Sequence, residues 1–437
     1  MTEQSLTILF MPESAYGPTN QCIGLGDQLR RRGHRVVFAA EESWRGKLEA
    51  MGFDEDLVQL APPADSSAEQ DPGQFWKDFV RDTAPEFRKP TVDQLSTVIR
   101  PIFEGLIDGV QFCETQLREV VGRVRPDVIV EDNVISFPAL LTAKTPFVRI
   151  ASCNPLEMKG PNVPPTFSGL PCDDDSEWAA FRAEFDSVHR SLWESFNDWV
   201  VDQGAPALPD LEFMHSSNTA NLYLYPHEAD YITARPLDPT WHQMDSSVRE
   251  TDDAFDLPEL AARRPDGSAL IYLSLGSLGS ADVGLMQRLV EVLGQTPHRY
   301  IVSKGPLHAA YELADNMVGA EFLPQTSLMP HVDAVITHGG NNTVTEAMHF
   351  GKPMVVLPLF WDQYDNAQRM DEVGFGVRLP TYTFTDEEMR AALDRVLGAE
   401  LQTTLARVGA AVRGRAGLRA GADVIESVAR GAASARG

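Results

Sequence analysis

The chain has 437 residues, 43% of them hydrophobic, and its 63 acidic against 37 basic side chains give a net charge of −26 at pH 7. This length and apolar content predict two domains with separate cores, and the negative charge argues against nucleic acid or an anionic membrane surface as a partner. The N-terminal residues lack a basic segment before a long apolar one, no apolar run is long enough to span a membrane, and the four cysteines are far apart. We therefore expect a soluble cytoplasmic protein with no signal peptide, membrane anchor, disulfide framework or zinc site.

Strand and helix patterns alternate in the first half of the chain. An apolar strand at residues 6–11 is followed by a helix from about 20 to 32, which ends at Gly33, and by a strand at 35–40. Glycine readily takes the left-handed backbone conformation that commonly ends a helix. Further strands are predicted at residues 126–130, 146–150 and 221–225. This alternation is typical of strand–helix–strand crossovers in a parallel sheet.

Two long irregular segments interrupt this half. Residues 61–95 are rich in Pro, Asp, Ser and Gln and include Phe75 and Trp76, which we expect to face inward from a partly helical excursion. Residues 155–175 contain five prolines and are predicted to be irregular. Aromatic side chains then recur at helical spacing over residues 177–201, which indicates a core-facing helix or, alternatively, the lining of a pocket.

The alternation starts again after an acidic, proline-containing segment at residues 243–267, which we interpret as a linker. A strand at 269–274 runs into a Gly276-Ser277 turn, where a helix start offers a first phosphate contact. Further strands are predicted at residues 300–303, 334–337, 353–357 and 377–379, and helices complete the chain.

Polar residues gather where the strand at 334–337 ends. His338, Gly339 and Gly340 form a turn, and a helix is predicted to begin near Thr343. Free N–H groups and the dipole at a helix start favour an anion such as a diphosphate, and glycine lets the backbone approach it closely.

Side chains on either side of that turn suit a sugar. Asn342 adds a donor, Glu346 lies one turn into the helix, and Asp362-Gln363 follow the next strand, where we expect them to open into the same crevice. Together they indicate a nucleotide diphosphate sugar as the ligand. Simpler interpretations stay open, because Thr343 and Glu346 also have the spacing of a capping box, and a Gly-Gly pair is often only a turn.

The stretch from Phe322 to Gln363 resembles the donor-binding signature of the family 1 glycosyltransferases, which use nucleotide sugars to glycosylate small molecules. The residues that carry the resemblance are Pro324-Gln325, His338, Gly340, Asn342-Thr343, Glu346, Gly351, Pro353, Pro358 and Asp362-Gln363. From His338 onward the pattern fits without a gap. Phe322 stands where plant members carry a tryptophan that stacks on the base.

The resemblance implies an α/β GT-B fold, in which two Rossmann-like, doubly wound domains face each other across a cleft. We expect an acceptor-binding domain at residues 1–242, the linker at 243–267, a donor-binding domain at 268–415, and a tail at 416–437 that crosses back to the first domain. The implied donor contacts are Gly276, Ser277, Phe322, Gln325, His338, Gly340, Asn342, Thr343, Glu346, Asp362 and Gln363. The expected acceptor contacts are Asn20, Phe75 and Trp76.

The usual general base of the family is missing. Its members carry a histidine in a Gly-His-x-x-Pro pattern after the first strand, and an aspartate from a later strand end orients it. Here Gly17 aligns with the glycine, Pro18 replaces the histidine, and Asp132 holds the place of the aspartate. We favour Asp132 as the base, with a pKa raised by burial, over an acceptor that needs little activation, such as a carboxylate or an acidic phenol. A third account has another residue act as the base: Glu13, His189 or His215.

We therefore expect an inverting, metal-independent enzyme that moves a hexose from a UDP-sugar to a small apolar acceptor such as a natural product, without a cofactor. UDP-glucose is the expected donor because Asp362-Gln363 matches glucose-using members of the family; a dTDP-deoxysugar is the alternative. The chain is expected to be a monomer or a weak homodimer. Two other functions stay open: a non-catalytic nucleotide-sugar binder, which the loss of the histidine suggests, and a nucleotide-sugar epimerase of the same fold.

Overall fold

The structure is a computed structural model that describes residues 4–13, 15–62, 83–248, 256, 258 and 265–436. Phe75 and Trp76, with most of the predicted excursion at 61–95 and much of the predicted linker, lie outside the described residues. Among the described residues, no helix is both long enough and apolar enough to cross a membrane.

The first domain is built on a parallel sheet in the order β3-β2-β1-β4-β5-β6-β7. Its strands are β1 (Thr7–Pro12), β2 (Arg35–Phe38), β3 (Asp54–Glu55), β4 (Val128–Asp132), β5 (Phe147–Ala151), β6 (Ala220–Tyr223) and β7 (Trp241–Gln243). The central strands read as apolar runs because helices cover both faces of the sheet. β1 pairs with β4 so that Pro12 lies opposite Asp132, which brings the loops after these two strands together.

Two sets of helices cover the sheet. α1 (Tyr16–Arg31) packs on one face, and α4 (Arg100–Val124) and α6 (Trp178–Asp202) enclose a core on the other. Short helices α3 (Thr91–Gln94) and α5 (Pro138–Leu141) complete this domain. α1 begins earlier than predicted, so Pro18 lies in its first turn, where the missing N–H breaks no helical hydrogen bond.

The second domain has a parallel sheet in the order β10-β9-β8-β11-β12-β13. The strands are β8 (Leu270–Ser274), β9 (Arg299–Ser303), β10 (Met317–Ala320), β11 (Ala334–Thr337), β12 (Met354–Val356) and β13 (Gly376–Arg378). The helices are α8 (Gly276–Gly279), α9 (Val283–Gly294), α10 (Gln325–Leu328), α11 (Asn341–His349), α12 (Gln363–Glu372), α13 (Asp386–Val396), α14 (Ala399–Arg415) and α15 (Gly417–Arg436).

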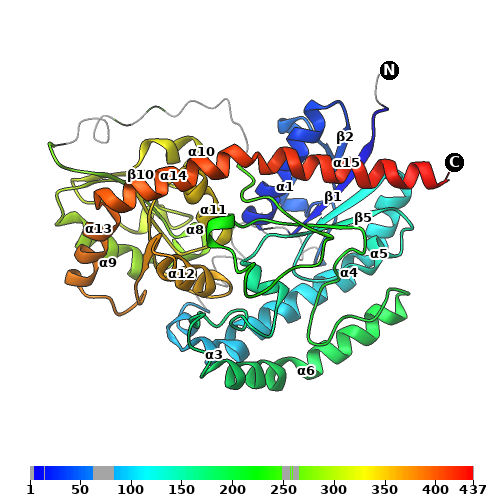
Figure 1. Ribbon diagram of the computed structural model, residues 1–437, viewed down its shortest axis with the longest axis horizontal. Helices are drawn as coiled ribbons and strands as arrows, with labels where there is room; N and C mark the ends of the chain where they lie inside the picture. The colour runs from blue at the N-terminus through cyan, green and yellow to red at the C-terminus, as the bar shows by residue number, and fades with distance from the viewer. Residues whose placement is uncertain are drawn as a thin grey trace.

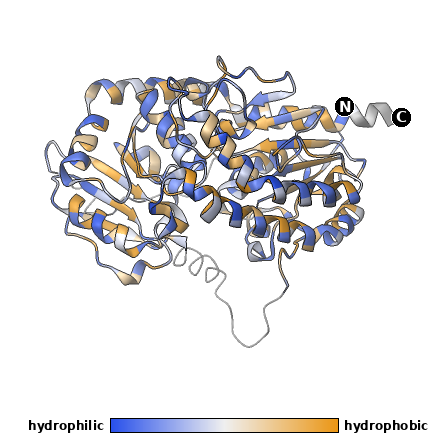
Figure 2. Ribbon diagram, turned by 90° about the horizontal axis from the view of Figure 1, so that it is seen from below, coloured by the Kyte–Doolittle hydropathy of each residue, from blue (hydrophilic) through white to orange (hydrophobic). Residues whose placement is uncertain are grey.

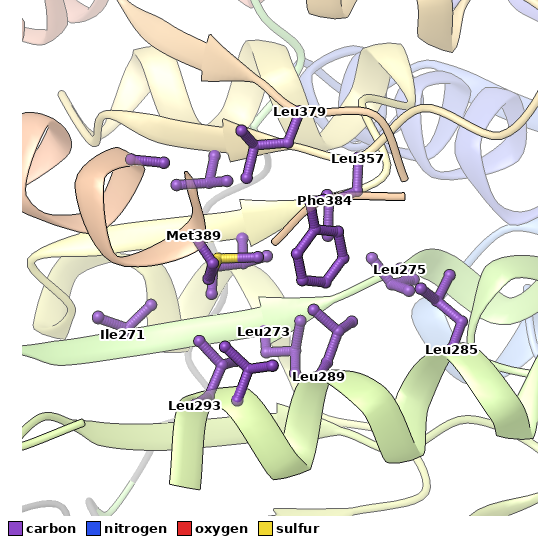
Figure 3. Close-up of a cluster of buried hydrophobic side chains, with 14 of the residues drawn as sticks. Ile271, Leu273, Leu275, Leu285, Leu289, Leu293, Leu357, Leu379, Phe384 and Met389 are labelled. Atoms are coloured by element: carbon purple, nitrogen blue, oxygen red, sulfur yellow. The ribbon is translucent and has the colours of Figure 1, made fainter. Parts of the chain in front are cut away.

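Leucine-rich faces of the helices pack onto this second sheet. Figure 3 shows Leu285, Leu289 and Leu293 of α9 turned toward Ile271 and Leu273 of β8. In Figure 2 the strands of both sheets are predominantly hydrophobic, whereas the outer faces of the helices are hydrophilic. The predicted fold class, two doubly wound α/β domains, is confirmed.

The two domains share the last helix. α15 leaves α14 and lies along the first domain, where Ala422, Ile425 and Ala429 enter the core beneath α1 (Figure 1). The start of the predicted linker is instead part of this ordered region: β7 ends at Gln243, Met244 is buried in the same core, and residues 246–247 are buried as well.

Candidate active site

The turn between β11 and α11 leaves the start of the helix open. Gly339 has φ +90°, and Gly340 is the N-cap of α11, which begins at Asn341 rather than near Thr343. No side chain caps this helix, so the alternative interpretation of Thr343 and Glu346 as a capping box is wrong. The free N–H groups of the first turn therefore remain available for an anion.

The ring of His338 lies against Gly276 and Gly340, and a side chain at either position would clash with it. A Cβ on Gly276 would lie 2.9 Å from the ring Cε1 and Nε2, and a Cβ on Gly340 would lie 2.6 Å from Nε2. Burial lowers the pKa of His338 to about 4, although a hydrogen bond to the Ser274 backbone opposes the shift. The ring is therefore neutral at pH 7 and lies beside the start of α11, where the sequence predicted a phosphate contact.

Glu346 is held by amides. Gln325 Nε2 donates to Glu346 Oε2 at 2.6 Å and to Thr343 Oγ1 at 3.2 Å, and Asn342 Nδ2 donates to Glu346 Oε1 at 3.1 Å. Tyr272 OH in turn donates to Gln325 Oε1 at 3.2 Å. The predicted residues Gln325, Asn342, Thr343 and Glu346 thus form one network at the carboxyl edge of the second sheet.

Two predicted donor contacts remain at the surface. Phe322 is 58% exposed, which is unusual for a large apolar side chain and leaves its ring accessible for stacking. Ser277 is also exposed and lies in the first turn of α8, directly after Gly276, whose φ of +68° requires glycine.

Asp362 and Gln363 do not open freely into a crevice, contrary to our expectation. Asp362 is 7% exposed, and its Oδ2 accepts a hydrogen bond of 2.9 Å from the backbone N–H of Asn154 in the first domain. Burial raises the pKa of Asp362 to about 7. Gln363 Oε1 accepts from the N–H groups of Leu359, at 3.0 Å, and of Phe360, at 3.4 Å, which orients its amide.

Further bonds join the domains at this edge. Asn341 Nδ2 donates to the carbonyl groups of Ser152 and Leu224 at 2.7 and 3.0 Å. Asp365 accepts from the N–H groups of Phe167 and Gly169 at 2.7 and 2.8 Å. These residues come from loops that follow different strands, and sequence reasoning did not single them out. The first turns of α11 and α12 are therefore fixed against the carboxyl edge of the first sheet.

Asp132 ends β4 at the same edge. It is 2% exposed, and burial raises its pKa to about 8 against an opposing hydrogen bond from Ser152. Cys22 Sγ lies 3.8 Å from Asp132 Oδ2. Glu13 follows the neighbouring strand β1 and raises the pKa of Asp132 further by charge repulsion, while burial raises its own pKa to about 7. The structure thus brings two predicted candidate bases together.

The first turn of α1 faces the donor-site residues. A Cβ on Gly17 would lie 3.9 Å from the Cβ of Asn342, across the boundary between the domains. Pro18 follows in the same turn, and Asn20 comes two residues after Pro18 along α1.

Two histidines proposed as substitute bases are occupied elsewhere. His189 is fully buried, with a pKa lowered to about 4 by burial, and its Nδ1 donates to the Phe185 carbonyl at 2.9 Å. His215 lies 2.6 Å from Ser136 Oγ through Nδ1 and 2.9 Å from the Pro206 carbonyl through Nε2. Both are structural parts of the first domain.

A pocket lies beside this carboxylate cluster. Its lining residues are Phe103, Val134, Glu157, Lys159, Thr166, Phe167, Phe185, Leu211, Glu212, Phe213, Met214 and Trp361. Trp361 comes from the second domain, directly before Asp362, and its ring centroid lies 4.5 Å from that of Phe167 and 5.3 Å from that of Phe103. Phe185 belongs to the aromatic helix predicted at 177–201, whose other large rings lie mainly in the core.

Backbone strain concentrates in the lining of this pocket. Among the described residues eight non-glycine positions have a positive φ, and four of them line the pocket: Lys159 (40°), Phe167 (68°), Leu211 (54°) and Trp361 (59°). Bulky residues adopt this conformation at a cost of about 1–3 kcal/mol each, and such residues cluster at functional sites. These positions could not be predicted from the sequence, because a residue other than glycine with a positive φ has no sequence pattern of its own.

Comparison with known proteins supports the resemblance that the sequence motif indicated. A family model described as UDP-glucoronosyl and UDP-glucosyl transferase matches residues 248–404. Demethyllactenocin mycarosyltransferase of Streptomyces fradiae is 23% identical over 442 residues, which cover 96% of this chain and 86% of that protein. In both comparisons the chain is similar to glycosyltransferases that use nucleotide sugars. Human UDP-glucuronosyltransferase 1A5 is 28% identical over 212 residues, but the match spans 48% of this chain and only 34% of the human protein.

Solved structures share the fold of this chain. The glycotransferase of kitacinnamycin superposes with a TM-score of 0.68 at 20% identity, covering 97% of this chain and 99% of that one. The glycosyltransferase VinC, solved in complex with DTDP, gives 0.65 at 17% identity, covering 97% and 100%. The predicted GT-B fold is confirmed.

Proposed function

We propose that this glycosyltransferase moves a hexose from a nucleoside diphosphate sugar to a small, mainly apolar acceptor, with inversion and without a metal ion. The observation that carries the proposal is the meeting of two carboxyl edges: the open helix start at Asn341 faces the loops that hold Asp132 and Asn154. Substrates of doubly wound domains bind at such edges. An apolar, aromatic pocket beside them suits an apolar acceptor.

The donor is assigned to the second domain. The diphosphate would take the free N–H groups of α11, with His338 beside it, because the positive end of a helix stabilises negative charge. The exposed ring of Phe322 would stack on the base, and the fixed carboxylate of Glu346 would accept from the ribose hydroxyls. Asp362 and Gln363 would meet the hexose, whose hydroxyls must share or replace the bond from Asn154 N–H to Asp362.

Asp132 is proposed as the general base. It would take the proton of the acceptor hydroxyl while the oxygen attacks the anomeric carbon from the face opposite the diphosphate. The bond from that carbon to the phosphate oxygen breaks, and the nucleoside diphosphate leaves with the electron pair. A pKa near 8 makes this carboxylate a better base than an ordinary aspartate, and Glu13 is the alternative base in the same cluster.

The donor contacts described above do not distinguish a uridine from a thymidine nucleotide. UDP-glucose remains our proposal, and similarity to the UDP-glucuronosyltransferases supports a uridine nucleotide. The DTDP bound in the VinC structure supports the alternative, a dTDP-sugar. Phe322 would stack on uracil and thymine alike. The selection between a UDP-sugar and a dTDP-sugar would therefore also depend on contacts with the sugar.

The first experiment measures nucleotide release from UDP-glucose and dTDP-glucose with a panel of flavonoids, sterols, macrolides and aromatic acids. A product one hexose heavier, with an anomeric configuration opposite to that of the donor and a yield unaffected by a chelator, is the expected result. Tight donor binding without product from any acceptor would favour a non-catalytic nucleotide-sugar binder. Nucleotide release without any acceptor would favour an epimerase.

A further inference from the structure

The acceptor pocket contains more negative charge than an apolar ligand needs. Glu157 and Glu212 both line it, and among the described residues neither carboxylate makes a side-chain hydrogen bond or a salt bridge. The oxygens of both carboxyl groups remain accessible from the pocket, so a ligand group that enters it can contact them.

The charges around Glu157 are also mainly negative. Asp132, Asp362 and Glu212 repel it, whereas Arg149 and Lys159 attract it. Arg149 is itself paired with Glu131 at 3.0 Å, with both side chains fully buried. A ligand group that reaches Glu157 therefore meets several carboxylates whose field favours a positive charge and disfavours an anion.

The positive charge of Lys159 compensates only part of the negative charge around Glu157. Its Nζ donates to the Leu211 carbonyl at 2.6 Å and lies 5.4 Å from the centroid of the Phe185 ring. Its charge attracts Glu212 and Asp210, and it is also among the groups that face Glu157. The lining of the pocket thus holds one cation, Lys159, for two carboxyl groups, those of Glu157 and Glu212.

The remaining rings have the arrangement that binds organic cations. Phe103 stacks on Phe213 with centroids 4.2 Å apart, and Trp361 closes against Phe103 and Phe167. Ring faces next to carboxylates recognise ammonium groups, and desolvated pairs of cation and ring contribute about 2 kcal/mol.

We propose that the acceptor of this glycosyltransferase carries a basic nitrogen, which binds as an ammonium group between these aromatic rings and the carboxylate of Glu157. This inference rests on the proposed function, in which the pocket holds the acceptor. It also argues against one of the accounts of the missing histidine, because a carboxylate acceptor would be repelled by Glu157, Asp132 and Asp362.

The pocket must open for such a ligand to enter. The space between its side chains is about 40 Å³, room for about three water molecules. Trp361 belongs to the second domain, so parting of the domains enlarges the space from that side. Acceptor entry is then coupled to domain opening, and the ammonium group becomes enclosed when the domains close again.

The test uses binding and needs neither a donor nor turnover. Calorimetry on the full chain at about pH 9, where the carboxyl of Glu157 is ionised, compares benzyltrimethylammonium with its neutral isostere neopentylbenzene and with the anion phenylacetate. We expect the ammonium compound to bind at least about tenfold more tightly than neopentylbenzene, and phenylacetate to bind most weakly. Equal affinities for the ammonium compound and its isostere would overturn the proposal.

A matched pair of variants locates the effect. Glu157→Gln keeps the shape of the side chain and is expected to weaken benzyltrimethylammonium about tenfold while leaving neopentylbenzene unchanged. Glu184→Gln removes the same charge from the exposed side of α6 and should change neither affinity. Equal losses in both variants would mean that only the net charge of the protein is sensed, and would also overturn the proposal.

The pH dependence gives an independent readout. Burial raises the pKa of Glu157 to about 8, so the carboxyl is largely neutral in the empty pocket at pH 7. The quaternary probe does not titrate, so its affinity should rise between about pH 6 and about pH 9, with release of a proton, and this rise should be absent in Glu157→Gln. Cation selectivity without sugar transfer would refute the proposed function alone, whereas transfer without cation selectivity would refute this inference alone.

Discussion

Two neighbouring carboxyls at the end of β4 should respond to substitution in opposite ways. Asp132→Asn is expected to stabilise the protein at pH 8 and to remove most of its turnover. Glu131→Gln is expected to destabilise the protein and to leave the pH dependence of turnover unchanged. The side chains alternate along the strand: Glu131 pairs with Arg149, whereas Asp132 makes no salt bridge among the described residues and feels the charge of Arg149 only from a distance.

The magnitude for Asp132 follows from its pKa. Burial raises that pKa from 3.8 to about 8. Between these values the folded state holds a proton that the unfolded state releases, so folding stability falls by about 1.4 kcal/mol per pH unit and by roughly 5 kcal/mol in all. Asparagine is neutral in both states and avoids this loss. Weaker hydrogen bonds to Ser152 and Cys22 offset part of the gain, so we expect about 2 kcal/mol at pH 8 and no gain near pH 4.

The magnitude for Glu131 follows from its partner. Arg149 donates to Glu131 Oε1 at 3.0 Å, to the Asn133 carbonyl at 2.8 Å and to the His215 carbonyl at 2.8 Å, and it is fully buried. Removing the carboxylate leaves a buried guanidinium without its countercharge, which costs about 3–5 kcal/mol.

Urea unfolding of both variants at about pH 5 and about pH 8, together with initial rates of transfer, measures these effects. Loss of the base should lower kcat by about a hundredfold or more in Asp132→Asn, and in the wild type kcat/KM should rise with pH up to about 8. A destabilised Asp132→Asn, or a difference from wild type that does not grow with pH, would refute the reasoning about stability. Full turnover of this variant would instead make Glu13 the base, which Glu13→Gln then tests.

Three further outcomes are expected. Gly340→Ala should weaken nucleoside diphosphate binding by about tenfold or more, with little change in unfolding, because its Cβ displaces the ring of His338; unchanged affinity would remove the histidine from the phosphate site. Phe322→Ala should weaken UDP and dTDP equally, by about tenfold, in equilibrium titrations, since its exposed ring stacks on either base. Asp365→Ala leaves two N–H groups at residues 167–169 unpaired and should raise KM for both substrates and increase the radius of gyration in solution; an effect on one substrate alone would contradict its role in domain closure.

The fold was predictable where strands are buried on both faces. Apolar runs at residues 334–337 and 269–274 correspond to β11 and β8, which lie in the middle of their sheet. The strands that the sequence did not indicate, β3, β7 and β10, all lie at sheet edges. An edge strand is short and partly exposed, so it needs no apolar run, and its pairing depends on a neighbour distant in sequence.

The site was predictable where it is local. His338, Gly340 and Glu346 lie within one strand, turn and helix, so their spacing alone already indicates the proposed donor site. The acceptor pocket has no such spacing, because Phe103 and Trp361 come from different domains and meet only in the folded chain. The segment that contains Phe75 and Trp76, predicted to contact the acceptor, lies outside the described residues.

One short segment connects the two substrate sites. Trp361 closes the acceptor pocket in a strained left-handed conformation, and the next residue, Asp362, holds the Asn154 backbone of the first domain. A donor sugar that engages Asp362 therefore acts one residue away from the wall of the acceptor pocket. If the hexose replaces the bond from Asn154, the same event that seats the donor also loosens the contact that keeps the domains closed. Donor binding would then make room for the acceptor, and water would be excluded from the anomeric carbon once the domains close over both substrates.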